Sequence, residues 1–305
     1  QSFGDWELIC VNDGSTDGSL SKLEAYASKD PRIRVFSKPN GGALNARNYG
    51  VRQACSKWLY RMDADDLLSP DLLEEMIRTA NEQDADYVIP EQVHWWPDQP
   101  EKTYYFNREH GVFEKLSGRE ALIKSLMWEF HGRAMCRLDT YMKYTFDSDI
   151  GFIDEYVARL VILNSRKIVY SKGEYYYRQN TGSLCYKPSV RRFHVLERSR
   201  LSEQLLLTVC DDPQTIHNYR RLLFGELIGC TRLYLSQYQL FDKEERRQIV
   251  ELLTAAYRRT DKKAFHGYCL KPGWNNKYLG MLSFTNWTVF RIALLLQNRI
   301  HAFRN

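Results

Sequence analysis

Apolar and polar positions at the start of the chain alternate between strand-like runs and segments of helical spacing. Residues 6–11 (Trp-Glu-Leu-Ile-Cys-Val) predict a short buried strand, which leads into a Gly- and Ser-rich turn and an amphipathic helix. The same pattern continues with a strand at 33–36, a helix at 43–54 and a strand at 58–62. Strands and helices that alternate at this spacing predict a parallel α/β sheet with right-handed crossovers.

The middle of the chain predicts further elements around that sheet. An amphipathic helix is expected over 69–83 and a strand over 86–90. Ser117 and Glu120 have the spacing of a capping box, which predicts a helix start at Ser117. Residues 91–116 are rich in aromatic side chains, which can pack against sugar rings but more commonly fill a core.

After residue 188 the pattern is helical. Apolar positions recur every three or four residues in three segments, 189–210, 214–238 and 243–259. The amphipathic segment 284–303 could lie in a membrane interface, although packing on its own domain is the more frequent use of such a helix. The sequence therefore predicts an α/β domain over 1–185 and a helical region over 186–305.

Composition is that of a globular protein. Hydrophobic residues make up 44% of the chain and charged residues 27%, which excludes a disordered chain. The seven cysteines form no Cys-x-x-Cys pair, which argues against a disulfide framework or a zinc site and for a reducing cytoplasm. No apolar run reaches ~18 residues, so the sequence predicts no transmembrane helix.

The net charge of +5 conceals a division between the two halves. Residues 1–154 hold 18 Lys and Arg against 26 Asp and Glu, and residues 155–305 hold 25 against 12. A basic half beside an acidic half suggests an anionic partner, either a membrane surface or a lipid-linked pyrophosphate acceptor. The alternative is a solvated basic surface without a partner. No nucleic-acid partner is expected, because no recognised binding motif accompanies the charge. We expect a cytoplasmic protein, with peripheral contact at the inner face of the plasma membrane as an open option.

The strongest chemical signal is the sequence Asp-Ala-Asp-Asp at 63–66, directly after the third predicted strand. Neighbouring carboxylates repel one another, and Mg²⁺ or Mn²⁺ is typically held by one or two carboxylates together with substrate phosphates. The alternative is a solvated turn before the next helix, which the sequence Ser-Pro-Asp at 69–71 would start. Ligands bind at the carboxyl ends of strands in parallel α/β sheets, where Asp13, Asp63 and Asp65 all lie. This arrangement suits a nucleotide diphosphate bridged to a metal ion.

Three linked motifs resemble the glycosyltransferase family 2 signature in order and spacing. They are Val-Asn-Asp-Gly-Ser-Thr-Asp (11–17), Asn-Gly-Gly-Ala-Leu-Asn-Ala-Arg-Asn-Tyr-Gly (40–50) and Met-Asp-Ala-Asp-Asp (62–66). The resemblance covers residues 1–185 and implies a GT-A fold, a nucleotide-sugar donor, a divalent metal and inversion at the anomeric carbon. It also implies that the family's first strand and helix are missing, because the chain starts at the family's Gln-Ser-Phe-Gly-Asp-Trp equivalent.

The resemblance implies roles for individual residues. Asp13 would contact the nucleotide base and Asp63 would lie near the ribose. Asp65 would bind the metal on the diphosphate, with Asp63 as a second candidate metal ligand. Arg47 would lie near the donor, as would Asn40, which stands in a glycine loop that lets the backbone approach a ligand closely.

Asp154 and Glu155 form a second acidic pair, at the start of a predicted helix, where they could simply favour the helix dipole. The segment resembles the family's Glu-Asp motif, with Ile153 in place of the glutamate. On that alignment Asp154 is the catalytic base and Glu155 is the rival candidate. Such a base takes the proton from the acceptor hydroxyl as it attacks, and a metal on the diphosphate stabilises the leaving group.

The segment Tyr-Tyr-Arg-Gln-Asn-Thr-Gly-Ser (176–183) resembles a Tyr-Tyr-Arg…Gly-Ser segment of many relatives. The resemblance implies that Arg178 and Ser183 face the diphosphate, and the alternative is an edge strand and turn. The Gln-x-x-Arg-Trp motif of processive polysaccharide synthases is absent, which favours addition of a single sugar.

Together these observations predict a bacterial-type family 2 glycosyltransferase of the α/β class. We expect a GT-A-type, mostly parallel sheet flanked by helices, with a C-terminal α-helical extension. The expected reaction is inverting transfer of one sugar from a nucleotide-diphosphate sugar, with a UDP-sugar favoured, to a glycan or lipid-linked acceptor in surface polysaccharide synthesis, with Mn²⁺ or Mg²⁺. A sugar nucleotidylyltransferase would need a Gly-rich phosphate loop near the start, which is not seen. A catalytically inactive, glycosyltransferase-like binding or scaffold protein is the alternative outside the enzymes.

Overall fold

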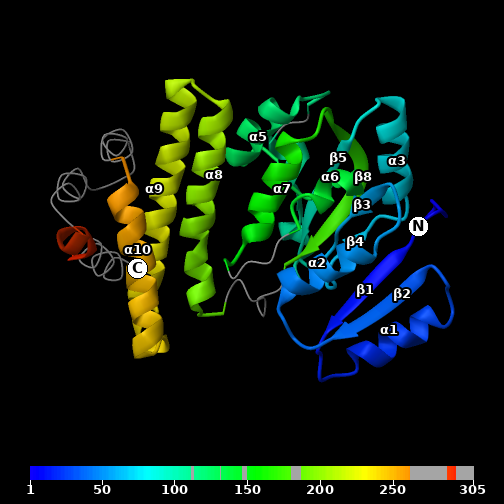
Figure 1. The fold of residues 1–305 in the computed structure, drawn as a ribbon, viewed down its shortest axis with the longest axis horizontal. Coiled ribbons are helices and arrows are strands. Elements are labelled where there is room, and N and C mark those ends of the chain that lie inside the picture. The colour runs from blue at the N-terminus through cyan, green and yellow to red at the C-terminus, as the bar shows by residue number, and fades with distance from the viewer. Residues whose placement is uncertain (111–112, 131, 146–149, 180–186, 262–286, 293–305) are drawn as a thin grey trace. The chain divides into compact units, whose positions relative to one another are not determined.

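The computed structural model describes residues 1–110, 113–130, 132–145, 150–179, 187–261 and 287–292 (Figure 1). The chain divides into two compact units. The first comprises Gln1–Asp149 and Asp154–Asn180, and the second comprises Ile150–Ile153 and Thr181–Asn305. The described part of the first unit combines sheets and helices, and the described part of the second is helical.

The N-terminal layer of the first unit is a parallel strand pair with two helices. Its elements are β1 (Leu8–Asp13), α1 (Ser19–Ala27), β2 (Ile33–Lys38) and α2 (Ala43–Gln53). The register runs from Leu8 opposite Ile33 to Asp13 opposite Lys38, so the last two residues meet at the carboxyl ends of both strands. Helix α2 packs closely on β1, since a Cβ atom on Gly50 would lie 3.1 Å from Val11 Cγ2.

The larger sheet of the first unit mixes parallel and antiparallel pairs. Its strands are β3 (Trp58–Tyr60), β4 (Leu67–Leu68), β5 (Tyr87–Trp95), β6 (Tyr104–Tyr105), β7 (Met135–Arg137) and β8 (Ile168–Arg178). They follow the order β3-β7-β5-β8-β4, and β6 pairs with β5. Strands β5 and β8 are parallel, and the other pairs are antiparallel. The three predicted N-terminal strands therefore do not form one continuous parallel sheet, because β3 pairs with the antiparallel β7.

Strand β5 is longer than the sequence pattern predicted. The register between β5 and β8 shifts between Ile89 and Glu91, where Pro90 stands. Proline has no N–H to donate to the ladder, so a bulge at this position lets pairing resume. The strand then continues to Trp95 and carries aromatic residues of the predicted 91–116 region.

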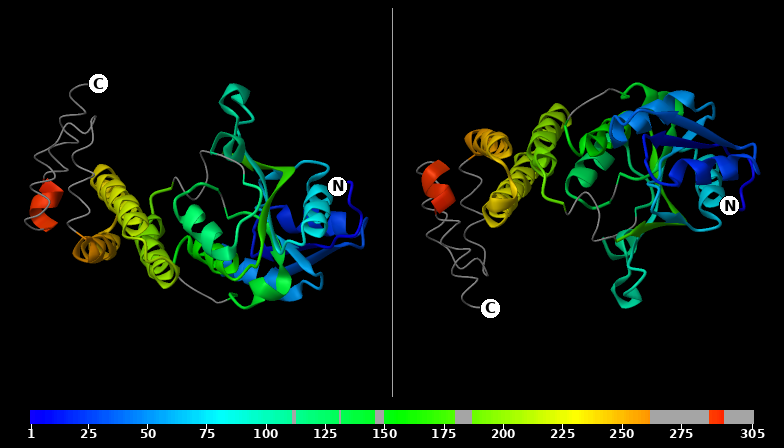
Figure 2. Two further views of the ribbon diagram at one scale, coloured as in Figure 1. Left: turned by 90° about the horizontal axis from the view of Figure 1, so that it is seen from above. Right: turned by 90° about the horizontal axis from the view of Figure 1, so that it is seen from below.

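Helices cover both faces of the larger sheet (Figure 2). They are α3 (Leu72–Glu82), α4 (Phe106–His110), α5 (Gly118–Leu126), α6 (Leu138–Met142) and α7 (Ile153–Leu163). Helix α3 packs on β8 and β5 through Leu72 and Met76, which are fully buried. The predicted capping box at Ser117 and Glu120 is confirmed at the start of α5.

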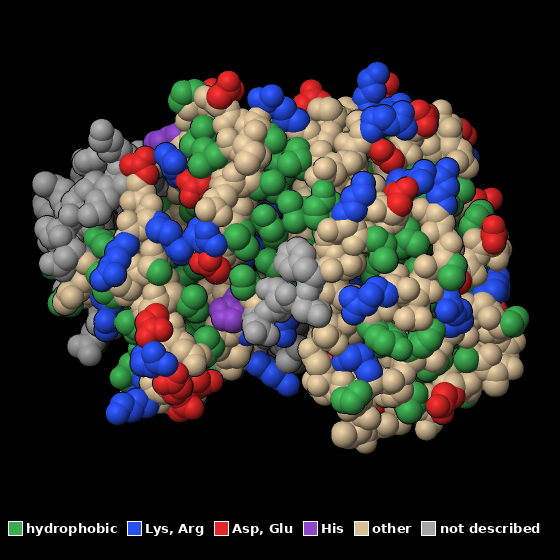
Figure 3. Space-filling view, in the orientation of Figure 1, with side chains coloured by type: hydrophobic (Ala, Val, Ile, Leu, Met, Phe, Trp, Pro, Cys, Tyr) green, Lys and Arg blue, Asp and Glu red, His purple; other side chains and the backbone are tan. Residues whose placement is uncertain are grey.

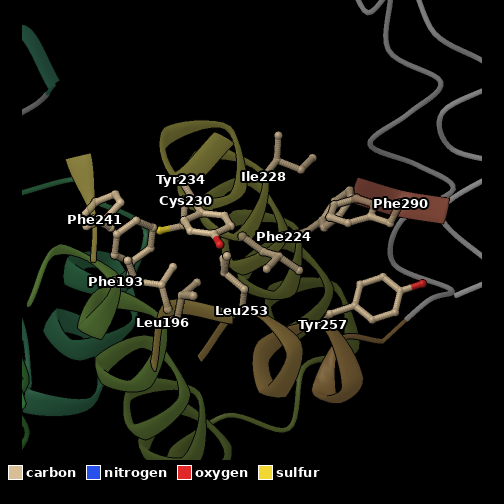
Figure 4. Packing of buried hydrophobic residues seen from close by; sticks show 12 residues of the cluster. Phe193, Leu196, Phe224, Ile228, Cys230, Tyr234, Phe241, Leu253, Tyr257 and Phe290 are labelled. Atoms are coloured by element: carbon tan, nitrogen blue, oxygen red, sulfur yellow. The ribbon is translucent and has the colours of Figure 1, made fainter. Parts of the chain in front are cut away.

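The described part of the second unit contains three long helices around an aromatic core (Figure 4). They are α8 (Val195–Val209), α9 (Pro213–Ser236) and α10 (Lys243–Arg259), close to the predicted helical segments. Asp212 caps α9 by accepting a hydrogen bond from the Thr215 N–H, and Asp242 begins α10 with a capping box. Figure 3 shows Lys and Arg side chains interspersed with Asp and Glu on the visible face of these helices.

The described part of the predicted amphipathic segment packs on this core. Phe290 is buried, and its ring centroid lies 5.4 Å from that of Tyr257 and 6.3 Å from that of Phe224. The rest of 284–303 lies outside the described residues. In the part of the chain that the structure describes, no helix is long and apolar enough to cross a membrane.

Candidate active site

Asp13 is the last residue of β1 and lies at the edge of the site. Its Oδ1 atom accepts hydrogen bonds from Lys38 Nζ at 2.6 Å and from the Gly41 N–H at 2.9 Å. Partial burial acts to raise the pKa of Asp13, but these donors outweigh it and the pKa is lowered. Gly14 has a φ of +72°, and a Cβ there would lie 2.8 Å from Asn40 N. The turn thus needs glycine and places Asn40, which is exposed, beside Asp13.

The three aspartates after β3 occupy three different environments. The Asp66 side chain is fully buried, accepts a hydrogen bond from the Tyr175 hydroxyl, and accepts another from the Arg178 N–H at 2.8 Å. The Asp63 side chain is 42% exposed, and Asp65 is exposed. Asp66 therefore anchors the segment to β8, and the other two carboxylates remain accessible to a ligand.

Arg133 is a member of the site that the sequence did not reveal. Its Nη2 atom donates to Asp63 Oδ2 at 2.8 Å, and its Nη1 atom donates to the Tyr175 hydroxyl at 2.6 Å. Burial acts to raise the pKa of Asp63, but Arg133 and then Arg47 outweigh it and lower the pKa. Arg133 stands in no motif, and only the pairing of the following strand β7 with β3 and β5 brings it near Asp63.

Arg47, on α2, connects the acidic segment to the predicted base. Its Nη2 atom lies 3.7 Å from Asp63 Oδ1, and its Nη1 atom lies 3.2 Å from Asp154 Oδ2. Asp154 stands in the first turn of α7 with 40% of its side chain exposed. Glu155 forms an ion pair with Arg159, one turn further along the same helix, at 3.5 Å. Of the two candidate bases, Asp154 is thus the one that these contacts connect to Asp63.

Arg178 lies beside Asp65, at the end of β8. Its Nε atom donates to the Asp65 backbone carbonyl at 2.7 Å, and its guanidinium lies 4.5 Å from the centre of the Trp95 ring. The carbonyl contact turns the arginine toward the strand end where the diphosphate was predicted. Ser183, predicted to share this role, lies outside the described residues.

The carboxylates of the site fit a divalent cation that is held partly by the substrate. Both carboxylate oxygens of Asp63 face an arginine, whereas no ion pair within the described ranges involves Asp65. Among those same residues no three Asp, Glu, His or Cys side chains gather around one point. Mg²⁺ and Mn²⁺ are commonly bound by one or two carboxylates plus phosphate oxygens, so Asp65 suits this kind of site.

The aromatic residues of 91–116 pack mainly within the sheet. His94 stacks on Tyr104 with ring centroids 4.6 Å apart, and Trp95 meets Tyr176 edge-on at 6.4 Å. These rings are partly exposed, so they serve core packing and still offer surface next to Arg178.

Comparison with known proteins gives the class of this protein. Residues 1–137 match the family model of glycosyl transferase family 2. Over these residues the chain is similar to glycosyl transferase family 2, and the protein is a glycosyltransferase.

Individual relatives agree with this assignment. The glycosyltransferase GlyG of Streptococcus pneumoniae serotype 4 is 27% identical over 264 residues, which cover 82% of this chain and 85% of GlyG. The uncharacterized glycosyltransferase EpsJ of Bacillus subtilis is 28% identical over 62% of this chain and 58% of its own length. The crystal structure of S. aureus TarS 1–349 in complex with UDP-GlcNAc matches with a TM-score of 0.65 and 17% identity, covering 98% of this chain and 85% of that one. This likeness shows the fold, and the GT-A class expected from the sequence is confirmed.

Proposed function

We propose that this glycosyltransferase moves one sugar from a nucleotide-diphosphate sugar to a glycan or lipid-linked acceptor, with a divalent metal and with inversion. The observation that carries the proposal is the position of Arg47 between Asp63 and Asp154. One guanidinium thereby joins a carboxylate of the donor motif to a carboxylate at a helix start. A donor and a base must meet in this way for a hydroxyl to attack the anomeric carbon.

Donor binding uses the strand ends. Asp13 would accept an N–H of the base, and Asp63 would accept ribose hydroxyls. Arg47 and Arg178 would donate to the diphosphate oxygens, which their planar guanidinium groups match in geometry. Asp65 would hold Mn²⁺ or Mg²⁺, which when bound neutralises charge on the departing diphosphate.

The transfer step needs a base on the acceptor side. Asp154 takes the proton from the acceptor hydroxyl while that oxygen forms a bond to the anomeric carbon. The bond from the anomeric carbon to the diphosphate oxygen breaks, and its electron pair leaves with the diphosphate. Attack from the face opposite the leaving group inverts the configuration, through an oxocarbenium-like transition state of the kind known for glycoside hydrolysis.

Arg47 also gives the site a resting state. Its contact with Asp154 stabilises the carboxylate but occupies an oxygen that would accept the proton. An anionic diphosphate offers Arg47 a competing partner, so donor binding would release Asp154 for catalysis. The base would then become available when the sugar is in place.

The relatives support the choice of donor and pathway. TarS was crystallised with UDP-GlcNAc, and it shares the fold of this chain. GlyG and EpsJ are bacterial proteins named as glycosyltransferases. We therefore favour a UDP-sugar as the donor and a bacterial surface polysaccharide as the destination.

A donor screen tests the proposal. Purified protein is incubated with UDP- and GDP-sugars, with Mn²⁺, with Mg²⁺ or with EDTA, and release of the nucleotide diphosphate is followed. We expect metal-dependent release with one donor class. Asp154→Asn should keep donor affinity and lose turnover by ~10²-fold or more, while Glu155→Gln stays near wild type. Nucleotide binding without release from any donor would favour a binding or scaffold protein.

A further inference from the structure

We propose that Arg133 is a positioning residue of the donor site. It holds the Asp63 carboxylate in the orientation that accepts the donor's ribose hydroxyls, and it keeps that carboxylate away from the metal ion, which is left to Asp65. The inference rests on the proposed function and extends it to a residue that stands outside every motif of the sequence.

Arg133 is in direct contact with Asp63. Arg133 Nη2 lies 2.8 Å from Asp63 Oδ2, and the arginine side chain is only 28% exposed. Hydrogen bonds between charged groups are shorter and stronger than neutral ones, and a guanidinium fixes direction as well as charge. The carboxylate plane of Asp63 is therefore set by the arginine.

Arg133 is itself held in place by its neighbours. Its guanidinium lies 4.9 Å from the ring centres of both Tyr175 and Tyr177. Its Nη1 atom donates to the Tyr175 hydroxyl, which in turn donates to the fully buried Asp66. Stacking on aromatic faces and a shared hydrogen-bond chain leave the arginine little freedom to turn. A ligand-binding carboxylate supported in this way is already in its working orientation before the ligand arrives.

Asp63 and Asp65 differ in the charges that surround them. Asp63 directs Oδ2 to Arg133 and Oδ1 toward Arg47, so a cation approaching it would meet positive charge on both sides. No ion pair within the described ranges involves Asp65. The Arg133 contact thus assigns Asp63 to hydroxyl recognition and leaves Asp65 to the metal.

The rival explanation is that Arg133 serves only to support the fold, through Tyr175 and Asp66. A double-mutant cycle separates the two roles, because a residue that acts through Asp63 has little effect once Asp63 is changed. The variants are Arg133→Met, Asp63→Asn and the pair together. The measured quantity is the Kd of UDP in EDTA, with GDP in parallel, so that metal and turnover do not enter.

We expect each single variant to weaken UDP binding by ~10-fold or more, the scale of a lost hydrogen bond to a charged group. The double variant should bind within about 2-fold of Asp63→Asn, because Arg133 has no further effect on binding once Asp63 is changed. Arg133→Lys keeps the charge but loses the planar, forked geometry of the guanidinium. Its affinity for UDP should lie between those of wild type and Arg133→Met. Losses that multiply in the double variant would overturn the proposal.

Arg137 provides a matched control on strand β7. It forms an ion pair with Asp139 at 2.8 Å and lies 5.9 Å from the Trp58 ring centre, much as Arg133 pairs with a carboxylate and stacks on rings. Arg137→Met should bind UDP as wild type does. Thermal unfolding shows whether each variant is folded. If Arg133→Met does not fold, Arg133→Lys replaces it in the double-mutant cycle.

The test distinguishes the two levels of the argument. If wild-type protein binds neither UDP nor GDP, the proposed donor site is wrong and the role of Arg133 falls with it. If wild type binds a nucleotide and Arg133→Met binds it equally well, only the role of Arg133 is wrong.

Discussion

Asp65 and Asp66 are neighbours in the chain, yet the structure predicts opposite consequences for their replacement by alanine. The Asp66 side chain is fully buried, and it accepts hydrogen bonds from the Tyr175 hydroxyl and the Arg178 N–H. Arg133 Nη1 lies 3.4 Å from the same carboxylate. Asp66→Ala would leave a tyrosine hydroxyl and a backbone N–H without their acceptor.

The size of the effect follows from these contacts. Leaving a donor without its acceptor costs about 1–3 kcal/mol, and Asp66→Ala does this to the Tyr175 hydroxyl and the Arg178 N–H, whereas Arg133 keeps its contact with Asp63. In a folded unit of 150–250 residues each kcal/mol shifts the unfolding midpoint by about 2–4 °C. The two lost acceptors together cost about 2–6 kcal/mol, so we expect Asp66→Ala to lower the midpoint by about 4–24 °C. The exposed Asp65 should tolerate alanine within about 0.5 kcal/mol.

Two assays on the same preparations test this contrast. Far-UV circular dichroism gives the unfolding midpoint, and nucleotide release with Mn²⁺ gives the activity. Asp65→Ala should unfold like wild type and lose metal-dependent release, whereas Asp66→Ala should unfold early. An unfolding midpoint for Asp66→Ala equal to that of wild type would refute the anchoring role, and an unstable Asp65→Ala would show that the two roles are exchanged.

Two further predictions concern other parts of the molecule. Burial acts to raise the pKa of Glu7, but hydrogen bonds from the Cys55 N–H, Arg34 and Ser56 outweigh it and lower the pKa. A lowered pKa adds stability that is present above the unfolded value and is lost as the pH falls through the folded one. Glu7→Gln should therefore lower the unfolding midpoint at pH 7, and its effect should shrink progressively as the pH falls below the ordinary glutamate value of about 4.3. An effect that stays constant as the pH falls would contradict this. The net charge of +13 after residue 154 predicts that the full chain co-sediments with anionic vesicles at low salt and is released by salt. Equal binding to neutral vesicles, or none to either, would leave the basic half as a solvated surface.

Local signals in the sequence predicted the elements well because their causes are local. The capping box at Ser117 and Glu120 forms as its spacing predicted, and α10 ends at Arg259 as the apolar period predicted. Strand pairing was less predictable, because the partner of β3 is β7, which lies far along the chain. The bulge at Pro90 shows the same limit, since the sequence alone suggested that a strand should end there.

The residues of the site likewise differ in how well the sequence predicted them. Sequence motifs predicted Arg47, Asp63 and Asp154, and in the structure Arg47 lies within ion-pair distance of both aspartates. No motif supplied Arg133, since its position beside Asp63 depends on how β7 pairs. The buried role of Asp66 was also hidden, because three aspartates within four positions look alike in the sequence and differ only in their burial.

The ion pairs of the site differ in length, and the difference predicts an order of substrate binding. Lys38 and Arg133 hold Asp13 and Asp63 at 2.6 and 2.8 Å, but Arg47 lies 3.2 Å from Asp154. An anionic donor should therefore displace the looser Arg47 contact first, which frees the base only after the donor has bound. With an acceptor identified by the donor screen, an analogue lacking the attacking hydroxyl should inhibit uncompetitively against the donor, since it binds only the donor complex. Competitive or noncompetitive inhibition would show that the acceptor also binds the free enzyme, and Arg47 would then not control access to Asp154.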